Sequence, residues 1–164
     1  AHMGYAVNRT PSHAPGTSVR TGQEVWQTSH HALLAHGMGC QAIRAASPVP
    51  CRIALVDNPA VTVPIDESPA NVAAAQKAFH ICGTNGGITF PALTGAYSPV
   101  YLEQLGADAP LIQAGDLEII HQPLDRLGLN IYTGTYVRAA DNQRGYEFLD
   151  FRENYPRLHM PWLW

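Results

Sequence analysis

The clearest pattern of apolar and polar positions along the chain lies in the stretch 124–133. Large apolar residues occupy every second position from 127 to 131, and the run lies between a proline and a glycine. Such a run is typical of a parallel β-strand that is covered on both faces. Asn130 and Tyr132 lie two residues apart, so we expect their side chains to share one face at the carboxyl end of the strand. They would either line a site or satisfy neighbouring backbone groups.

A second apolar run predicts a strand over residues 52–58. Its last two residues, Asp57 and Asn58, are polar, and Pro59 ends it. Polar side chains at the exit of a buried strand are typical of the active rim of a (β/α)8 barrel. The same three residue types are also common in turns, so a turn is an alternative for this position.

Helices are predicted before and between these two strands. A helix over 21–46 begins with a Thr-x-x-Glu capping box. Ser68 and Ser98 each precede a proline, which is typical of a helix N-cap followed by the first helical residue. Asp116 is expected to cap a short helical turn. The stretch 69–121 is therefore predicted to be a helical crossover between the strands.

The stretch 134–164 is predicted to form a hairpin and a loop. Two short strands over 135–138 and 146–151 flank a turn that is rich in Asp, Asn and Gly. With a loop over 1–20 at the start, the predicted order is helix, strand, helices, strand and hairpin. Two parallel strands joined by a long crossover are typical of an α/β sheet, and two such strands cannot cover their own faces.

Composition narrows the classes of partner. The 164 residues carry a net charge of −3, and Lys77 is the sole lysine among ten basic residues. The sequence contains no basic run, so neither nucleic acid nor an anionic membrane is an expected partner. No apolar run is long enough to span a membrane. Cys40, Cys51 and Cys82 show no paired spacing, which favours reduced thiols and a cytoplasmic location.

Two motifs suggest other chemistry but do not fit its requirements. His31 and His36 are five residues apart, not the four that place zinc ligands on one helix face, so structural histidines are expected. The glycine-rich stretch 83–87 follows a predicted helix, whereas a phosphate-binding loop follows a strand, so a linker is expected there. We therefore predict no metal and no cofactor.

Several segments, in chain order, resemble motifs of glycoside hydrolase family 1. Residues 30–37 resemble the family's fourth helix, usually written HNLLLAHA, and residues 90–97 resemble its dP…G.YP segment. Residues 125–133 resemble the DFLGINYYT segment of barrel strand six, with Arg126 and Ile131 in place of Phe and Tyr. Further likenesses lie in the segments 4–16, 52–58 and 160–162.

The resemblance implies a fold and an activity. Family 1 enzymes are retaining β-glycosidases built on a TIM barrel, so the chain is expected to be an α/β portion of a (β/α)8 barrel. By this resemblance, 1–20 is the loop after strand four, 21–46 is helix four, 52–58 is strand five and 124–133 is strand six. The substrate of the complete enzyme would be a β-glycoside, such as a β-D-glucoside.

The resemblance also implies roles for particular residues. Tyr132 would hydrogen-bond the catalytic nucleophile and favour its charged form, and Asn130 would face the scissile bond. Asn58 would orient its neighbours at the rim. His13 and Trp162 would line the aglycone subsite, where an aromatic face stacks on apolar sugar surface. Backbone capping by His13 and loop packing by Trp162 are the alternatives.

Both catalytic carboxylates of the family are expected to lie outside this chain. They belong to Asn-Glu-Pro and Glu-Asn-Gly motifs, and the sequence contains neither. Retaining hydrolysis needs two carboxyl groups about 5–5.5 Å apart. We therefore expect no catalytic residue here, no activity of the chain alone, and a need for the remaining barrel segments. The alternative is a non-catalytic assembly module that self-associates through open strand edges.

Overall fold

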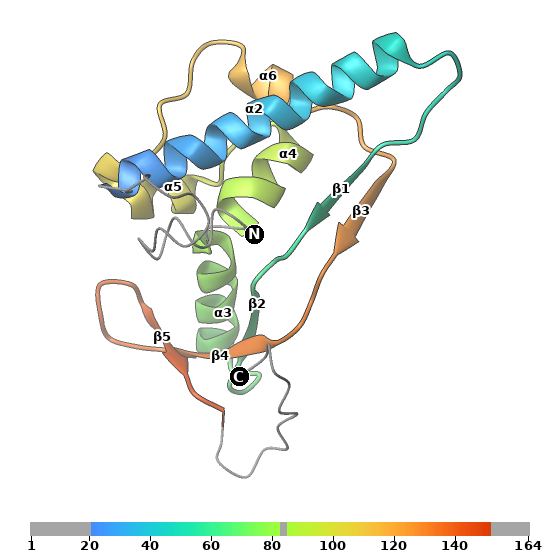
Figure 1. Ribbon diagram of the computed structural model, residues 1–164. Helices are drawn as coiled ribbons and strands as arrows, with labels where there is room; N and C mark the ends of the chain where they lie inside the picture. Colours follow the sequence, from blue (N-terminus) through green and yellow to red (C-terminus); the bar gives the residue numbers. More distant parts are fainter. Residues whose placement is uncertain (1–20, 83–84, 152–164) are drawn as a thin grey trace, which may run out of the picture.

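The computed structural model describes residues 21–82 and 85–151. Helix α2 (Gly22–Ala46) runs along one side of the molecule, above several shorter helices (Figure 1). Strands β1 (Ala54–Asp57) and β3 (Arg126–Leu129) form a two-stranded ribbon at the edge of this helical layer (Figure 1). The ribbon and the layer are the two parts that position the candidate site.

The long helix α2 begins at the capping box found in the sequence. The Thr21 hydroxyl accepts a hydrogen bond from the Glu24 N–H at 3.2 Å, and the Glu24 carboxylate accepts one from the Thr21 N–H at 3.2 Å. Two N–H groups that the first turn cannot satisfy internally are thereby paired. The predicted helix over 21–46 is confirmed.

The stretch 69–121 between β1 and β3 is helical, as predicted. Its elements are α3 (Pro69–Ile81), the π-helical turn η1 (Asn85–Thr89), α4 (Phe90–Thr94), α5 (Pro99–Leu105), the short 3-10 turn η2 (Gly106–Asp108) and α6 (Asp116–Ile120). The Ser68 hydroxyl accepts a hydrogen bond from the Asn71 N–H at 3.4 Å at the start of α3. The chain leaves α5 at Gly106, whose positive φ of 53° suits glycine.

The expectation of a linker at 83–87 is wrong for its described part. Residues 85–87 are buried in η1, and Tyr101 of α5 lies directly against them. A Cβ on Gly87 would lie 2.4 Å from the Tyr101 hydroxyl oxygen, and one on Gly86 would lie 2.1 Å from the His80 carbonyl oxygen. The two glycines therefore permit close packing of helices, which a reading of glycine as a flexible residue does not predict.

The described strands form two separate sheets. β1 and β3 pair in parallel, with Ala54 opposite Arg126 and Asp57 opposite Leu129. In the other sheet, β2 (Val61–Pro64) pairs in parallel with β4 (Gly134–Ala139), which pairs antiparallel with β5 (Tyr146–Leu149). The parallel strand pair and the hairpin are confirmed. The sequence does not predict β2, because Pro59 precedes it and Pro64 is its last residue, and proline is depleted in strands.

Strand β3 is shorter and more exposed than its apolar pattern predicts. It ends at Leu129, whereas a strand over 124–133 was expected. Leu127 and Leu129 are 37% and 49% exposed, so the expectation of burial on both faces is wrong for the described residues. Among the described strands β3 pairs only with β1.

Two clusters of buried side chains hold the remaining elements together. One joins the helical layer and consists of Leu33, Ala92, Tyr97, Tyr101 and Ile120, with Leu55 of β1 packed against it. The other joins α3 to the hairpin and consists of Ala74, Ala75, Ala78, Val137 and Tyr146. Within residues 21–82 and 85–151, no helix is long and apolar enough to cross a membrane.

Candidate functional site

The carboxyl ends of β1 and β3 lie side by side. The Asn130 N–H donates a hydrogen bond to the Asp57 carbonyl oxygen at 2.9 Å, one residue beyond the last paired position of β3. Asn58 follows Asp57 directly, and both asparagines are exposed. The structure therefore brings Asn58 and Asn130 together at the carboxyl end of the ribbon.

The alternation of side chains assigns the two faces of the ribbon. Leu55 and Asp57 point toward the helical layer and are half-buried and buried, whereas Val56 between them is 63% exposed. A Cβ built on Gly128 would lie 3.1 Å from Val56 Cγ2, so Gly128 shares this exposed face. Positions 58 and 130 come next in the alternation after Val56 and Gly128. They thus belong to the face opposite the helices.

A buried carboxylate braces the end of β1. Asp57 is 8% exposed, and its Oδ1 accepts a hydrogen bond from the Asn58 N–H at 2.7 Å. Its Oδ2 accepts a hydrogen bond from the Thr89 hydroxyl in η1. A buried carboxylate is costly unless such donors satisfy it. The π-helical turn is therefore tied to the strand end that carries Asn58.

The same turn also holds the chain just beyond the rim. Asn85 is 3% exposed, and its Nδ2 donates to the carbonyl oxygens of Ala60 at 2.9 Å and Phe79 at 3.0 Å. Its Oδ1 accepts a hydrogen bond from the Ala60 N–H at 3.1 Å. Turns of the π type recur at functional sites. Asn85 thus holds the segment after β1 in place by bonding both the N–H and the carbonyl group of Ala60.

Sequence reasoning identifies part of this brace and misses the rest. Asp57 is visible in the sequence as a polar residue at a strand exit, although it has no assigned role there. Thr89 lies 32 residues from Asp57, and Asn85 lies 25 residues from Ala60. Neither carries a periodic or motif signal, so only the fold shows that they contact the strand end.

Tyr132 does not lie on β3. Residues 130–133 belong to no strand, and Tyr132 is 67% exposed. The last paired position of β3 is Leu129, so alternation along the strand does not extend to Tyr132, and a shared face for Asn130 and Tyr132 stays a prediction. Their joint role stays a prediction. His13 and Trp162, the other two predicted site residues, lie outside the described residues.

A buried histidine links the helices behind the ribbon. His30 is fully buried, with Nδ1 2.9 Å from the Tyr97 hydroxyl oxygen and Nε2 2.9 Å from Asp116 Oδ2. Because an ionised carboxylate only accepts, Nε2 carries the proton of its hydrogen bond to Asp116, and Nδ1 shares a second hydrogen bond with the Tyr97 hydroxyl. His30 thus has a structural role, because it joins α2 to α6.

The two partners of His30 respond electrostatically to this arrangement. The hydrogen bond from His30, with one from the Gln113 N–H, holds the pKa of Asp116 below its ordinary value of 3.8. Burial, reinforced by the Asp116 charge, raises the pKa of the Tyr97 hydroxyl. The expectation that Asp116 caps α6 is wrong, because the N-cap is Gly115 in the left-handed conformation and the Asp116 carboxylate instead bonds Gln113 and His30.

The described glutamates do not gather at the strand ends. They lie in the first turn of α2, before α3, on α5, on α6 and on β5, where Glu147 pairs with Arg138. Within the described part of the chain, no glutamate follows β1 or β3. The geometry therefore offers polar side chains at a rim but no pair of glutamates there.

Comparison with known proteins places these strands in a larger fold. The sequence profile described as glycosyl hydrolase family 1 matches residues 1–154. A β-glucosidase of Agrobacterium sp. (strain ATCC 21400) is 39% identical over 137 residues, which cover 83% of this chain and 28% of that protein. A bifunctional β-D-glucosidase/β-D-fucosidase of Bifidobacterium breve is 32% identical over 145 residues, which cover 86% and 28%. The chain thus spans just over a quarter of the length of these curated relatives.

Solved structures give the same placement. The virulence factor SghA from Agrobacterium tumefaciens superposes with a TM-score of 0.70 at 33% identity, over 87% of this chain and 32% of that one. β-Glucosidase 2 from Trichoderma reesei superposes with a TM-score of 0.77 at 25% identity, over 98% and 37%. The fold is therefore an α/β portion of a (β/α)8 barrel, to which the parallel pair β1 and β3 belongs. Matched over most of its length in sequence and in structure, the chain belongs to glycosyl hydrolase family 1.

Proposed function

We propose that this chain supplies part of the sugar pocket of a retaining β-glycosidase that hydrolyses β-D-glucosides or related β-glycosides. The observation that carries the proposal is the parallel pairing of β1 with β3, which sets Asn58 and Asn130 at neighbouring carboxyl ends. Active sites of (β/α)8 barrels are built at this end of the strands. The names of the relatives support the substrate class.

Each proposed site residue has a distinct role. Tyr132 donates a hydrogen bond to the nucleophilic carboxylate supplied by the remaining barrel, and Asn130 contacts the sugar next to the scissile bond. Asn58 orients groups at the rim, and the bond from its N–H to Asp57 limits its freedom. His13 and Trp162 line the side that receives the aglycone.

The chain by itself is proposed to be inactive. Its sequence contains neither an Asn-Glu-Pro nor a Glu-Asn-Gly motif, and its described glutamates lie away from the strand ends. Hydrolysis with retention needs an acid/base and a nucleophile on opposite sides of the bond. We expect no release of 4-nitrophenol from 4-nitrophenyl β-D-glucoside above background, and turnover by the purified chain would contradict this proposal.

A chimera tests the proposed pocket. The segment of the Agrobacterium sp. β-glucosidase that matches this chain is replaced by the chain's own residues, and hydrolysis of the aryl glucoside is measured. Tyr132→Phe and Asn130→Ala should each lower kcat/KM about 10- to 100-fold, as expected for loss of a hydrogen bond to a charged group. Arg126→Gln, an exposed change on β3 just before the two site residues, is the matched control and should leave kcat/KM unchanged. An active chimera that tolerates both site substitutions would contradict the assignment.

Self-association is the competing function. The observation in its favour is that β1 and β3 pair only with each other among the described strands, which leaves their outer edges open. The β-glucosidase relatives favour the enzymatic role instead. Light scattering separates the two, because a stable monomer that folds cooperatively excludes assembly through these edges.

A further inference from the structure

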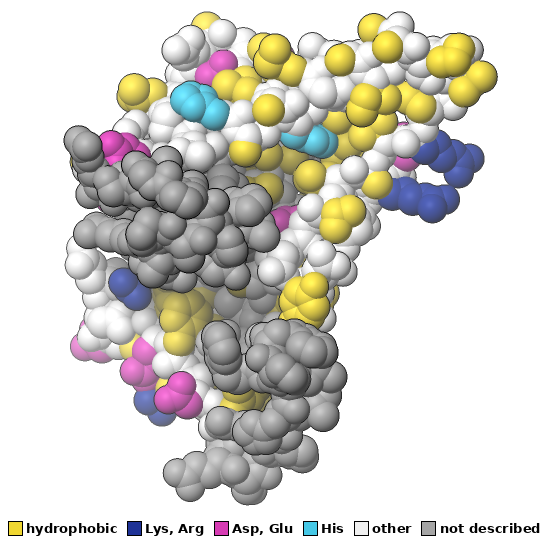
Figure 2. Space-filling model, in the orientation of Figure 1, with side chains coloured by type: hydrophobic (Ala, Val, Ile, Leu, Met, Phe, Trp, Pro, Cys, Tyr) yellow, Lys and Arg dark blue, Asp and Glu magenta, His cyan; other side chains and the backbone are white. Residues whose placement is uncertain are grey.

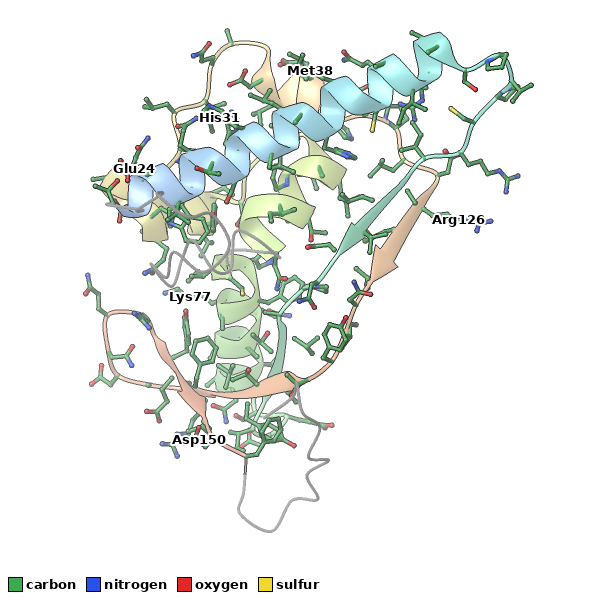
Figure 3. All side chains as sticks on the ribbon, viewed as in Figure 1. Glu24, His31, Met38, Lys77, Arg126 and Asp150 are labelled. Atoms are coloured by element: carbon green, nitrogen blue, oxygen red, sulfur yellow. The ribbon has the colours of Figure 1, made fainter. Side chains whose placement is uncertain are left out.

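A polar hollow lies on the side of the molecule away from the β1–β3 ribbon. Its volume is about 380 Å³, and α3, α5 and the turn between β4 and β5 enclose it. Its polar lining residues are Lys77, Glu103, Gln104, Gln143 and Arg144. Figure 3 shows Lys77 on the side of α3 that faces the β4–β5 turn. The volume lies in the range typical of sites for small molecules, about 300–1,000 Å³.

The walls of this hollow are held in fixed positions. The Asn142 side-chain oxygen accepts hydrogen bonds from the N–H groups of Arg144 at 3.0 Å and Gly145 at 2.9 Å, which fixes the turn. A Cβ built on Gly145 would lie 3.6 Å from Lys77 Nζ, so the ammonium group rests against that turn. The buried cluster between α3 and the hairpin holds the two walls together. The two cations thus reach the hollow from elements that are packed on each other.

The hollow is positively charged although the chain is acidic. Lys77 and Arg144 face a single lining carboxylate, that of Glu103, whereas the whole chain carries a net charge of −3. Arg138 on β4 is instead paired with Glu147. The hydrogen bonds and ion pairs found in the described part of the chain use neither the Lys77 ammonium nor the Arg144 guanidinium. These two groups are therefore available to a ligand.

The side chains define the chemistry of that ligand. An ammonium and a guanidinium together match a phosphate, which the guanidinium can bind with two parallel hydrogen bonds. The Glu103 carboxylate can only accept hydrogen bonds, so a ligand hydroxyl group would donate to it. The side-chain amides of Gln104 and Gln143 can both donate and accept hydrogen bonds. We propose that the hollow binds the phosphate monoester of a small polyol, with the phosphate between Lys77 and Arg144 and the hydroxyl groups against Glu103 and the two glutamines.

A titration of the 15N-labelled 164-residue chain tests the proposal. Glycerol 2-phosphate should shift the backbone amide resonances of residues 77, 103–104 and 143–145 in a saturable way. Glycerol should not shift them, and inorganic phosphate should bind more weakly than the ester. Lys77→Gln and Arg144→Gln should each weaken binding of glycerol 2-phosphate at least about fivefold, by loss of a charge-assisted hydrogen bond. Arg126→Gln, which removes a cation from β3 (Figure 3), should not change it.

Several outcomes would overturn this binding site. They are the absence of saturable shifts, equal affinity for inorganic phosphate and the ester, or binding that survives both Lys77→Gln and Arg144→Gln. A spectrum without dispersed signals from α3, α5 and the hairpin would also overturn it, since the hollow exists only when these elements pack together. None of these results depends on hydrolysis or on the strand ends, so the proposed glycosidase function stands or falls separately.

Discussion

The helical layer and the β1–β3 ribbon contain similar apolar residues, but their side chains are covered to very different extents. In the layer, Leu33, Tyr101 and Ile120 are 3%, 1% and 0% exposed. In the ribbon, Val56 and Leu129 are 63% and 49% exposed. Figure 2 shows hydrophobic side chains at the surface along this edge of the molecule. The described residues thus cover the apolar side chains of the helical layer far more completely than those of the ribbon.

This difference separates what stabilises the fold from what carries the proposed function. An amphipathic helix buries its apolar stripe against a few neighbours, and the short helices around α2 provide them. A barrel strand needs a neighbour on each edge and side chains that fill the barrel interior. The ribbon therefore depends on the layer for its position, through Leu55 in the core and through the bond between Asp57 and Thr89.

The largest expected effect contrasts one apolar residue from each region. Ile120→Ala in the layer should lower the free energy of unfolding by about 2–5 kcal/mol, because the fully buried side chain leaves a cavity. Leu129→Ala in the ribbon should cost less than about 1 kcal/mol, because half of that side chain is already exposed. Urea unfolding followed by circular dichroism measures both. If both substitutions lowered the free energy of unfolding equally, Leu129 would be as well buried in solution as Ile120. The helical layer and the ribbon would then not differ in burial.

A pair of glycines in α2 tests the close packing within the layer. A Cβ on Gly37 would lie 1.9 Å from the Ile119 carbonyl oxygen in α6, whereas nothing lies within 4 Å of one on Gly39. Gly37→Ala should therefore cost about 1–3 kcal/mol by forcing the helices apart. Gly39→Ala should gain up to about 1 kcal/mol, because alanine favours the helix. Thermal unfolding of both variants decides, and stabilisation by both substitutions would contradict the packing of α2 on α6.

A smaller change probes the connection between the two regions. Thr89→Val removes the hydroxyl that donates to Asp57 and should cost about 1 kcal/mol, since the Asn58 N–H still satisfies part of the carboxylate. Hydrogen exchange of the Asn58 and Asn130 amides should become faster, while that of α2 should not change. Thr94→Val, which removes a hydroxyl bonded within its own helix, is the control. Unchanged exchange at both asparagines would show that the brace does not hold the rim.

Local signals in the sequence predicted the layer well. The capping box at Thr21 and the Ser-Pro pair at Ser68 act within one helical turn, so their effect does not depend on the rest of the fold. The hairpin was predicted for the same reason, since its turn residues bond to each other. The sequence missed β2 and the π-helical turn, because proline and glycine are read as breaks in regular structure, although here they are packed.

The ribbon and its site were predicted less completely. The apolar pattern predicted two parallel strands with polar residues at their carboxyl ends, and the structure pairs these strands so that Asn58 and Asn130 meet. It did not predict where β3 ends, because the end of a hydrogen-bond ladder is set by the partner strand and not by the residues alone. The exposure of Leu129 has the same origin, since burial depends on which elements lie opposite.

The smallest expected effect concerns pH and again belongs to the layer. Burial lowers the pKa of His36 in α2 below its ordinary value of 6.5. The unfolded chain then binds a proton at this site more readily than the folded chain does, so folding loses stability as the pH falls below 6.5 toward the folded pKa. His36→Gln should remove this part of the acid dependence between about pH 7 and about pH 5.

The matched control for this substitution is His31→Gln on the same helix, where the histidine is exposed. The measurement is the change in unfolding free energy with pH, from urea titrations of the three proteins at each pH. His36→Gln should show the shallower slope, because His36 takes up its proton against the cost of burial beside Cys40, whose sulfur lies 3.7 Å from His36 Nε2. If His31→Gln reduces the pH dependence of the unfolding free energy as much as His36→Gln does, burial of His36 in the layer is not its source. The contrast between a covered layer and an exposed ribbon then loses this support.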